Sequence, residues 1–140
     1  TSVPPALDLP GFDASIDLDT CELEVVIEND AIGFDKGSDL IRPDGRTKLA
    51  AVADALAGAD EVVVIGHTST EGSAEANLDL SRRRAAAVIG VLEPAVPGAD
   101  FRGDGRGEEQ PIVVPDDTEE QRAHNRRVEV RAEVEAEVCS

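Results

Sequence analysis

The stretch Gly66–Ala85 reads GHTSTEGSAEANLDLSRRRA, and the fold can be worked out from it in both directions. It follows Val62–Ile65, an unbroken apolar run that is typical of a central strand covered on both faces. Residues 66–72 then predict a polar loop, and residues 74–92 predict a helix that Pro94 ends. A buried strand thus leads through a short loop into the amino end of a helix. We expect unpaired N–H groups and the positive end of the helix dipole to face that loop.

Two polar side chains share one face of the predicted helix. Asn77 and Arg84 are seven residues apart and therefore lie two turns from each other on that face. Leu78, Ala85 and Leu92 form a different, apolar face that we expect to pack inward. A helix amino end, an amide and a guanidinium together suit a carboxylate, because arginine binds a carboxylate through two parallel hydrogen bonds. The stretch therefore predicts a local site for such an anion.

The rest of the chain predicts an α/β fold, or α+β sandwich, in which helices pack on a sheet. The expected elements are strands at 21–28, 62–65, within 99–114 and at 128–138, helices at 43–58 and 74–92, and a loop or short helix at 116–125. Residues 1–20 are rich in Pro and Asp and lack periodicity, so they predict a linker before a single domain at 21–140.

Two further expectations concern the context of the chain. No apolar run approaches the roughly 18 residues needed to cross a bilayer, so we expect no membrane insertion by this segment. Its first ten residues have neither the basic start nor the apolar stretch of a signal peptide. We therefore expect the chain to be part of a longer protein.

The formal net charge of −17 excludes nucleic acid as a general partner, because binding phosphates requires a positive surface. An anionic membrane surface would repel the chain for the same reason. Arginines nevertheless gather at 82–84 and 122–131. They either build a local anion site or balance neighbouring carboxylates on the surface.

No enzyme chemistry is predicted. Ser69 lies near His67, but the GHTST segment lacks the G-x-S-x-G turn of a nucleophilic serine, and a lone histidine at a strand end is usually structural. The glycines at 103, 105 and 107 match no phosphate-binding loop. Two distant cysteines and two histidines give no paired metal-ligand spacing, so neither a metal nor a cofactor is expected.

Three blocks of sequence, taken in order, resemble the OmpA C-terminal domain family, which includes the Pal lipoproteins and the flagellar stator component MotB. The blocks are G-H-T-x-x-x-G-S-x-x-x-N-x-x-L-S-x-x-R-A at 66–85, G-x-G-E-x-x-P-I at 105–112 and N-R-R-V-E-V at 125–130. The resemblance spans about residues 23–131. It implies a β-α-β-α-β-β-type mixed sheet of four strands, with the last strand inserted antiparallel between the first two.

The two cysteines, Cys21 and Cys139, lie near the two ends of the folded region. The residues alone allow a disulfide, which would indicate an oxidising compartment, or two buried thiols. The implied topology favours the disulfide, because it brings the start of the first strand beside the end of the last.

The resemblance also implies a function, namely non-catalytic binding of the peptidoglycan stem peptide, usually through meso-diaminopimelate. Such a domain anchors a parent protein to the cell wall, in the periplasm, at the outer membrane or at the wall itself. In the family, an Asp after the G-H-T triplet and the Arg of the L-S-x-x-R-A block hold the ammonium and the carboxylate. Carried over, the binding residues are Asn77, Arg84 and Arg126, with Thr68 and Asp35 as lesser candidates.

The chain departs from the family pattern at Ser69, which stands where the family has that Asp. A hydroxyl cannot neutralise an ammonium, and losing a charged partner in such a site costs about 2–5 kcal/mol. Three outcomes follow. Glu71 supplies the carboxylate instead, or the ligand is a stem with a different or amidated diamino acid, or the domain is a structural or protein-interaction module that no longer binds peptidoglycan. We expect it to be a monomer or a weak homodimer.

Overall fold

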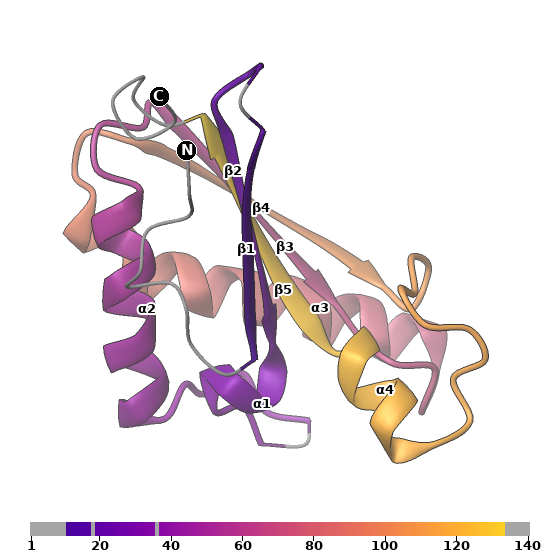
Figure 1. The fold of residues 1–140 in the computed structure, drawn as a ribbon. Coiled ribbons are helices and arrows are strands. Elements are labelled where there is room, and N and C mark those ends of the chain that lie inside the picture. Colours follow the sequence, from indigo (N-terminus) through magenta and orange to yellow (C-terminus); the bar gives the residue numbers. More distant parts are fainter. Residues whose placement is uncertain (1–10, 18, 36, 134–140) are drawn as a thin grey trace.

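A computed structural model describes residues 11–17, 19–35 and 37–133. In this part of the chain, one mixed sheet has the strand order β1-β2-β5-β3-β4 (Figure 1). The strands are β1 Phe12–Asp17, β2 Glu22–Glu28, β3 Glu61–His67, β4 Asp100–Gly107 and β5 Arg127–Glu133. The helices are α1 Asn29–Ile32, α2 Pro43–Ala55, α3 Ala74–Leu92, η2 Glu93–Ala95 and α4 Glu119–Asn125.

The last strand lies in the middle of the sheet, as the resemblance implied. Val130 of β5 pairs with Val25 of β2 on one side and with Val64 of β3 on the other, antiparallel in both cases. Strand β4 runs parallel to β3 at the far edge. The predicted α/β fold class and the insertion of the last strand are confirmed.

One face of the sheet carries the core, beneath α2 and α3. Alternate residues of the inner strands point to this face, because side chains of a strand alternate between its two sides. They form one cluster with the inward residues of the two helices: Leu23, Val25, Ile27, Val62, Val64, Val128, Val130, Leu49, Val52, Leu56, Ala85, Val88 and Leu92. Helix α3 has the bounds that the sequence predicts, and Ala85 and Leu92 are buried as expected.

Two glycines let α3 lie close to the strands. A methyl group on Gly66 would collide with the backbone carbonyl of Ser81, and one on Gly105 would collide with Arg82. The Ser81 hydroxyl accepts a hydrogen bond from the Gly107 amide at 3.0 Å and donates one to the carbonyl of Leu78 at 2.8 Å. This close approach fixes the helix that carries Asn77 and Arg84.

The structure corrects the sequence analysis near both ends. Residues 12–17, predicted as linker, form strand β1 on β2, so the sheet has five strands and not four. The third predicted strand covers only Asp100–Gly107, and Ile112 and Val114 beyond it are exposed. The sequence allowed either a loop or a short helix at 116–125, and the structure has a short helix at 119–125. Residues 1–10 lie outside the described residues.

Of the two cysteines in the predicted disulfide, Cys21 is among the described residues and Cys139 is not. Glu22 pairs with Glu133, so the start of β2 lies beside the end of β5, as expected. Cys139 and the continuation of the last strand to residue 138 lie outside the described residues, and the Cys21–Cys139 bond stays a prediction. Within the described ranges, none of the helices is both long and apolar enough to serve as a membrane span.

Candidate ligand-binding site

A pocket of about 580 Å³ lies between α1 and its following loop, the loop after β3, and helices α3 and α4. We call it the arginine pocket. Its lining consists of Asn29, Asp30, Phe34, Gly37, Thr68, Ser69, Glu71, Ala76, Asn77, Leu80, Arg83, Arg84, Glu119 and Arg126. Of the seven positions that the sequence analysis connects with ligand binding, six are on this list, namely Thr68, Ser69, Glu71, Asn77, Arg84 and Arg126, and Asp35 is not. A second hollow, of about 720 Å³, contains none of them.

Arg84 is the buried cation of the arginine pocket, with only 3% of its surface exposed. Its Nε donates to the carbonyl of Ser38 at 2.8 Å, and its Nη2 donates to the carbonyl of Asp35 at 3.0 Å. The guanidinium also lies over the ring of Phe34. These contacts orient a planar donor group while Nη1 makes no hydrogen bond to the described residues.

No carboxylate among the described residues forms an ion pair with Arg84. Burial lowers the pKa of its guanidinium to about 10, and the charges of Arg126 and Arg83 act in the same direction. A buried positive charge without a counter-ion is costly, so an anion that enters the pocket would gain a strong, charge-assisted partner.

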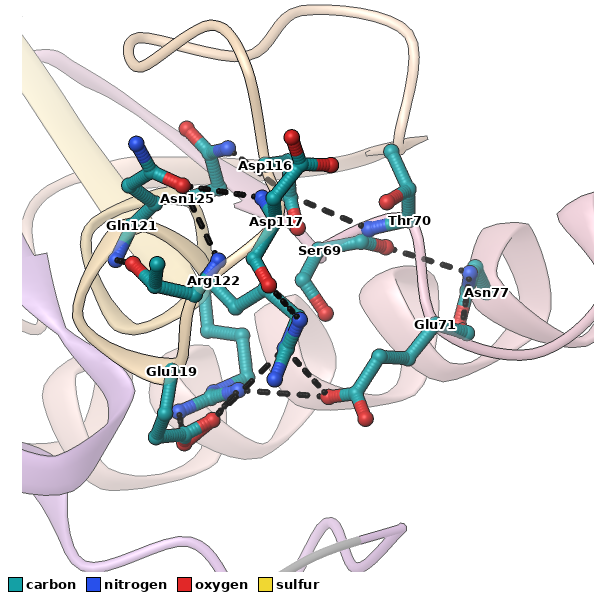
Figure 2. A network of polar contacts seen from close by, with 12 residues as sticks. Ser69, Thr70, Glu71, Asn77, Asp116, Asp117, Glu119, Gln121, Arg122 and Asn125 are labelled. Carbon is teal, nitrogen blue, oxygen red and sulfur yellow. Dashed lines mark hydrogen bonds and ion pairs between the residues drawn. The ribbon is translucent and has the colours of Figure 1, made fainter.

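The loop after β3 is braced by Asn77, whose Nδ2 donates to the carbonyls of Ser69 at 3.2 Å and Glu71 at 2.8 Å (Figure 2). The Thr68 amide donates to the carbonyl of Gly107 at 2.8 Å. The expected row of unpaired helix N–H groups is partly wrong, because the Ser73 hydroxyl caps the amide of Ala76 at 3.1 Å. Asn77 therefore holds the loop that lines the pocket through its amide nitrogen, and its Oδ1 is a further polar group of this side chain.

A second brace comes from Asn125, the first residue of the N-R-R block. Its Oδ1 accepts from the amides of Ile112 and Val113, and its Nδ2 donates to the Val113 carbonyl and to Oδ2 of Asp116. The same Asp116 oxygen accepts from the Thr70 amide at 3.3 Å, so this network reaches the pocket loop (Figure 2). We did not single out this structural role from the sequence.

Arg126 and Glu71 both line the arginine pocket and belong to one cluster of ion pairs, of which Figure 2 labels Glu71, Glu119 and Arg122. Arg126 binds Glu119 through two bonds of 3.0 and 2.7 Å, which raise the pKa of that arginine. Oε1 of Glu71 lies 3.3 Å from Nε of Arg122 and 3.6 Å from Nη1 of Arg126. The carboxylate that we predicted to replace the missing Asp thus already has two cationic neighbours.

Asp35 is the predicted residue that does not line the arginine pocket. Its backbone carbonyl binds Arg84, whereas its exposed carboxylate lies 3.5 Å from Nη2 of Arg42. The structure therefore places the backbone of Asp35, and not its side chain, against the buried arginine.

Asn29 and Asp30 are among the pocket residues that the sequence analysis missed. Asn29 is 2% exposed, and neither its Oδ1 nor its Nδ2 has a hydrogen-bond partner among the described residues. Asp30 forms no ion pair in the described part of the chain, and Oγ1 of buried Thr68 is likewise unpaired. The sequence offered one signal for these two residues. They directly follow the strand that ends at Glu28, just as Thr68 and Ser69 directly follow β3.

His67, which the sequence predicts to be structural, does not line the arginine pocket. It is buried in β3 with Nε2 3.4 Å from Oε1 of Glu129 in β5. Glu129 also accepts from Nε of Arg127 at 3.1 Å and Nη2 of Arg131 at 2.9 Å. Contact with His67, followed by the charges of these arginines, lowers the pKa of Glu129 to about 2.

The comparison with protein families decides the identity of the fold. The model of the OmpA family matches residues 33–126. The chain belongs to the OmpA family. Outer membrane protein A of Bordetella avium is 33% identical over 108 residues, which are 75% of this chain and 55% of that protein. A peptidoglycan-associated lipoprotein of Mesorhizobium japonicum is 38% identical over 91 residues, which are 63% of this chain and 54% of that protein.

Two solved structures share the fold. The cell wall anchor of the T6SS from Pseudomonas aeruginosa superposes with a TM-score of 0.79, at 27% identity, over 90% of both chains. The periplasmic domain of Helicobacter pylori MotB superposes with a TM-score of 0.71 at 22% identity, over 90% of this chain and 83% of that one, and supports the fold alone. The chain spans about half the length of the curated relatives named above. Their names agree with the expected location in the cell envelope.

Proposed function

We propose that this OmpA-family domain binds the stem peptide of peptidoglycan through a free carboxylate and thereby anchors its parent protein to the cell wall. The observation that carries the proposal is Arg84, a buried and oriented guanidinium in the lining of the arginine pocket that has no carboxylate partner among the described residues. The role is non-catalytic, because binding the carboxylate requires only fixed donors and a complementary charge.

The arrangement suits a planar anion. The carbonyls of Asp35 and Ser38 and the ring of Phe34 hold the Arg84 side chain, so little rotational freedom remains to be lost on binding. Asn77 holds the opposite loop in place. A carboxylate on a flexible peptide could therefore enter a site that is already formed.

The relatives support the same assignment. One is named as a peptidoglycan-associated lipoprotein, and one structural neighbour is described as a cell wall anchor. We extend to this domain a place in the cell envelope and the attachment to peptidoglycan that these names indicate.

A titration that follows backbone amide shifts tests the proposal. The ligands are meso-diaminopimelate and a stem tripeptide that contains it, added to wild type, Arg84→Ala, Arg84→Lys and Arg82→Ala. We expect Arg84→Ala to abolish binding and Arg84→Lys to weaken it more than tenfold, because lysine cannot form the paired bonds. Arg82 is exposed on the same helix outside the pocket, so its variant serves as the matched control. Unchanged binding by Arg84→Ala would contradict the proposal.

Two observations favour a second candidate, a structural or protein-interaction module of the same fold. Ser69 lacks the family charge, and Glu71 is already paired with Arg122 and Arg126. Sedimentation with insoluble peptidoglycan separates the two functions, because the second candidate predicts that the domain stays in the supernatant.

A further inference from the structure

We propose that Asn29 and Asp30 form the cation-binding half of the arginine pocket and receive an ammonium group of the ligand whose carboxylate Arg84 binds. This inference rests on the proposed function and defines the ligand more narrowly, as a zwitterionic amino-acid end rather than any carboxylate. The carboxylate that replaces the missing family Asp then belongs to α1 and not to the loop after β3.

The ion pairs of the charged residues that line the arginine pocket distinguish Asp30 from the other carboxylates of the lining. Arg83 pairs with Asp79 at 2.9 Å, and Arg126 pairs with Glu119 at 2.7 Å. Glu71 has two arginines within 4 Å, as described above. Among the described residues, Arg84 and Asp30 are therefore the two charged groups of the pocket that have no ion-pair partner. One is positive and the other is negative, as an amino-acid zwitterion requires.

Asn29 supplies an independent observation. A buried amide with both polar atoms unpaired costs about 1–3 kcal/mol for each group, and native proteins rarely tolerate it without a reason. Thr68 adds a second unpaired buried acceptor, Oγ1, to the same pocket lining. An ammonium donates three hydrogen bonds, and the carboxylate of Asp30, Oδ1 of Asn29 and Oγ1 of Thr68 are three acceptors of the kind it needs.

The electrostatics agree with this division of the pocket. The Asp30 carboxylate raises the pKa of Arg84, against the larger effects of burial and of Arg126 and Arg83, and it also raises the pKa of Arg126. Its negative field therefore reaches the arginine side of the pocket. Glu71, in contrast, already forms ion pairs with Arg122 and Arg126, so an ammonium beside it would compete with these two guanidinium groups.

Two dicarboxylates of equal chain length test the inference, namely meso-diaminopimelate and pimelate, which lacks both amino groups. We expect wild type to bind meso-diaminopimelate about tenfold or more tightly than pimelate at pH 7. In Asp30→Asn this preference should fall close to one, with pimelate bound at least as well as before. Asn29→Leu should lower the preference by a smaller factor. Asp44→Asn, an exposed Asp in the first turn of α2, is the matched control.

The outcomes separate the two proposals. If Asp30→Asn keeps the wild-type preference while Arg84→Ala loses both ligands, the inference is overturned and the proposed function stands. If Glu71→Gln removes the preference and Asp30→Asn does not, the ammonium acceptor is Glu71 and the inference is again overturned. If wild type binds neither dicarboxylate and is not retained by peptidoglycan, both proposals fail.

Discussion

The guanidinium of Arg84 lies over the ring of Phe34, with Cζ 5.0 Å from the ring centroid. The two residues come from different parts of the fold, since Phe34 follows α1 and Arg84 belongs to the middle of α3. Phe34 is itself a member of the hydrophobic core. The orientation of the Arg84 guanidinium is thus tied to the packing of the domain.

Replacing Phe34 with leucine should weaken carboxylate binding by up to about thirtyfold, because a cation–π contact at a desolvated site contributes roughly 1–2 kcal/mol. Pimelate affinity, measured by amide shifts, checks this. Phe101→Leu is the control, since Phe101 lies in β4 and is not among the residues of the arginine pocket. Equal losses of affinity in both variants would show that the ring acts only through general stability.

Pimelate binding should depend on pH in a way set by Arg84, whose pKa burial lowers to about 10. Below that pH the guanidinium is charged, so affinity should be constant from pH 7 to about 9 and fall as the pH rises through about 10. Pimelate carries no amine that titrates in this range. In Arg84→Lys the fall should begin at a lower pH, because burial also lowers the pKa of lysine. Constant wild-type affinity up to pH 12 would show that Arg84 stays charged in this range and that burial does not lower its pKa to about 10.

Asn29 and Asn125, two of the buried asparagines, should respond differently to replacement by leucine. Asn125 has four hydrogen bonds, so Asn125→Leu should lower the free energy of unfolding by about 2–4 kcal/mol. Asn29 has none from its side chain among the described residues, so Asn29→Leu should leave stability unchanged or raise it. Urea unfolding of both variants measures the difference. A large loss of stability in Asn29→Leu would indicate a structural role for this side chain.

Glu129 should control stability in acid, because its pKa is lowered to about 2. A carboxylate with a lowered folded-state pKa stabilises the fold above its unfolded value, and this contribution is lost as the pH falls from about 4.5 through about 2. At pH 7, Glu129→Gln should cost about 3 kcal/mol, because it leaves the buried Arg127 without its counter-ion. The difference from wild type, followed by urea unfolding, should shrink toward pH 2. Glu24→Gln, which loses a more exposed pair with Arg131, should cost less than about 1 kcal/mol at any pH.

The sequence predicted α3 and the positions of Asn77 and Arg84 because local signals specify them, namely helical periodicity and a terminating proline. It placed β4 only somewhere within 99–114, because the sequence of this strand, DFRGDGRG, lacks alternation, and its glycines admit α3 at short distance. Residues 12–17 do alternate, with Phe12, Ala14 and Ile16 toward one side, but the Pro- and Asp-rich surroundings hid this edge strand. Asn29 and Asp30 reach the pocket only through the pairing of distant strands, which local patterns do not reveal.

Arg84 is positioned by main-chain oxygens of residues 35 and 38, and every amino acid supplies such an oxygen. The side chains at these two positions can therefore drift during evolution without disturbing the receptor, provided that the loop keeps its course. Residue identity at 35 and 38 is consequently a poor guide to whether a related domain retains its ligand, and the conformation of the loop is the better one.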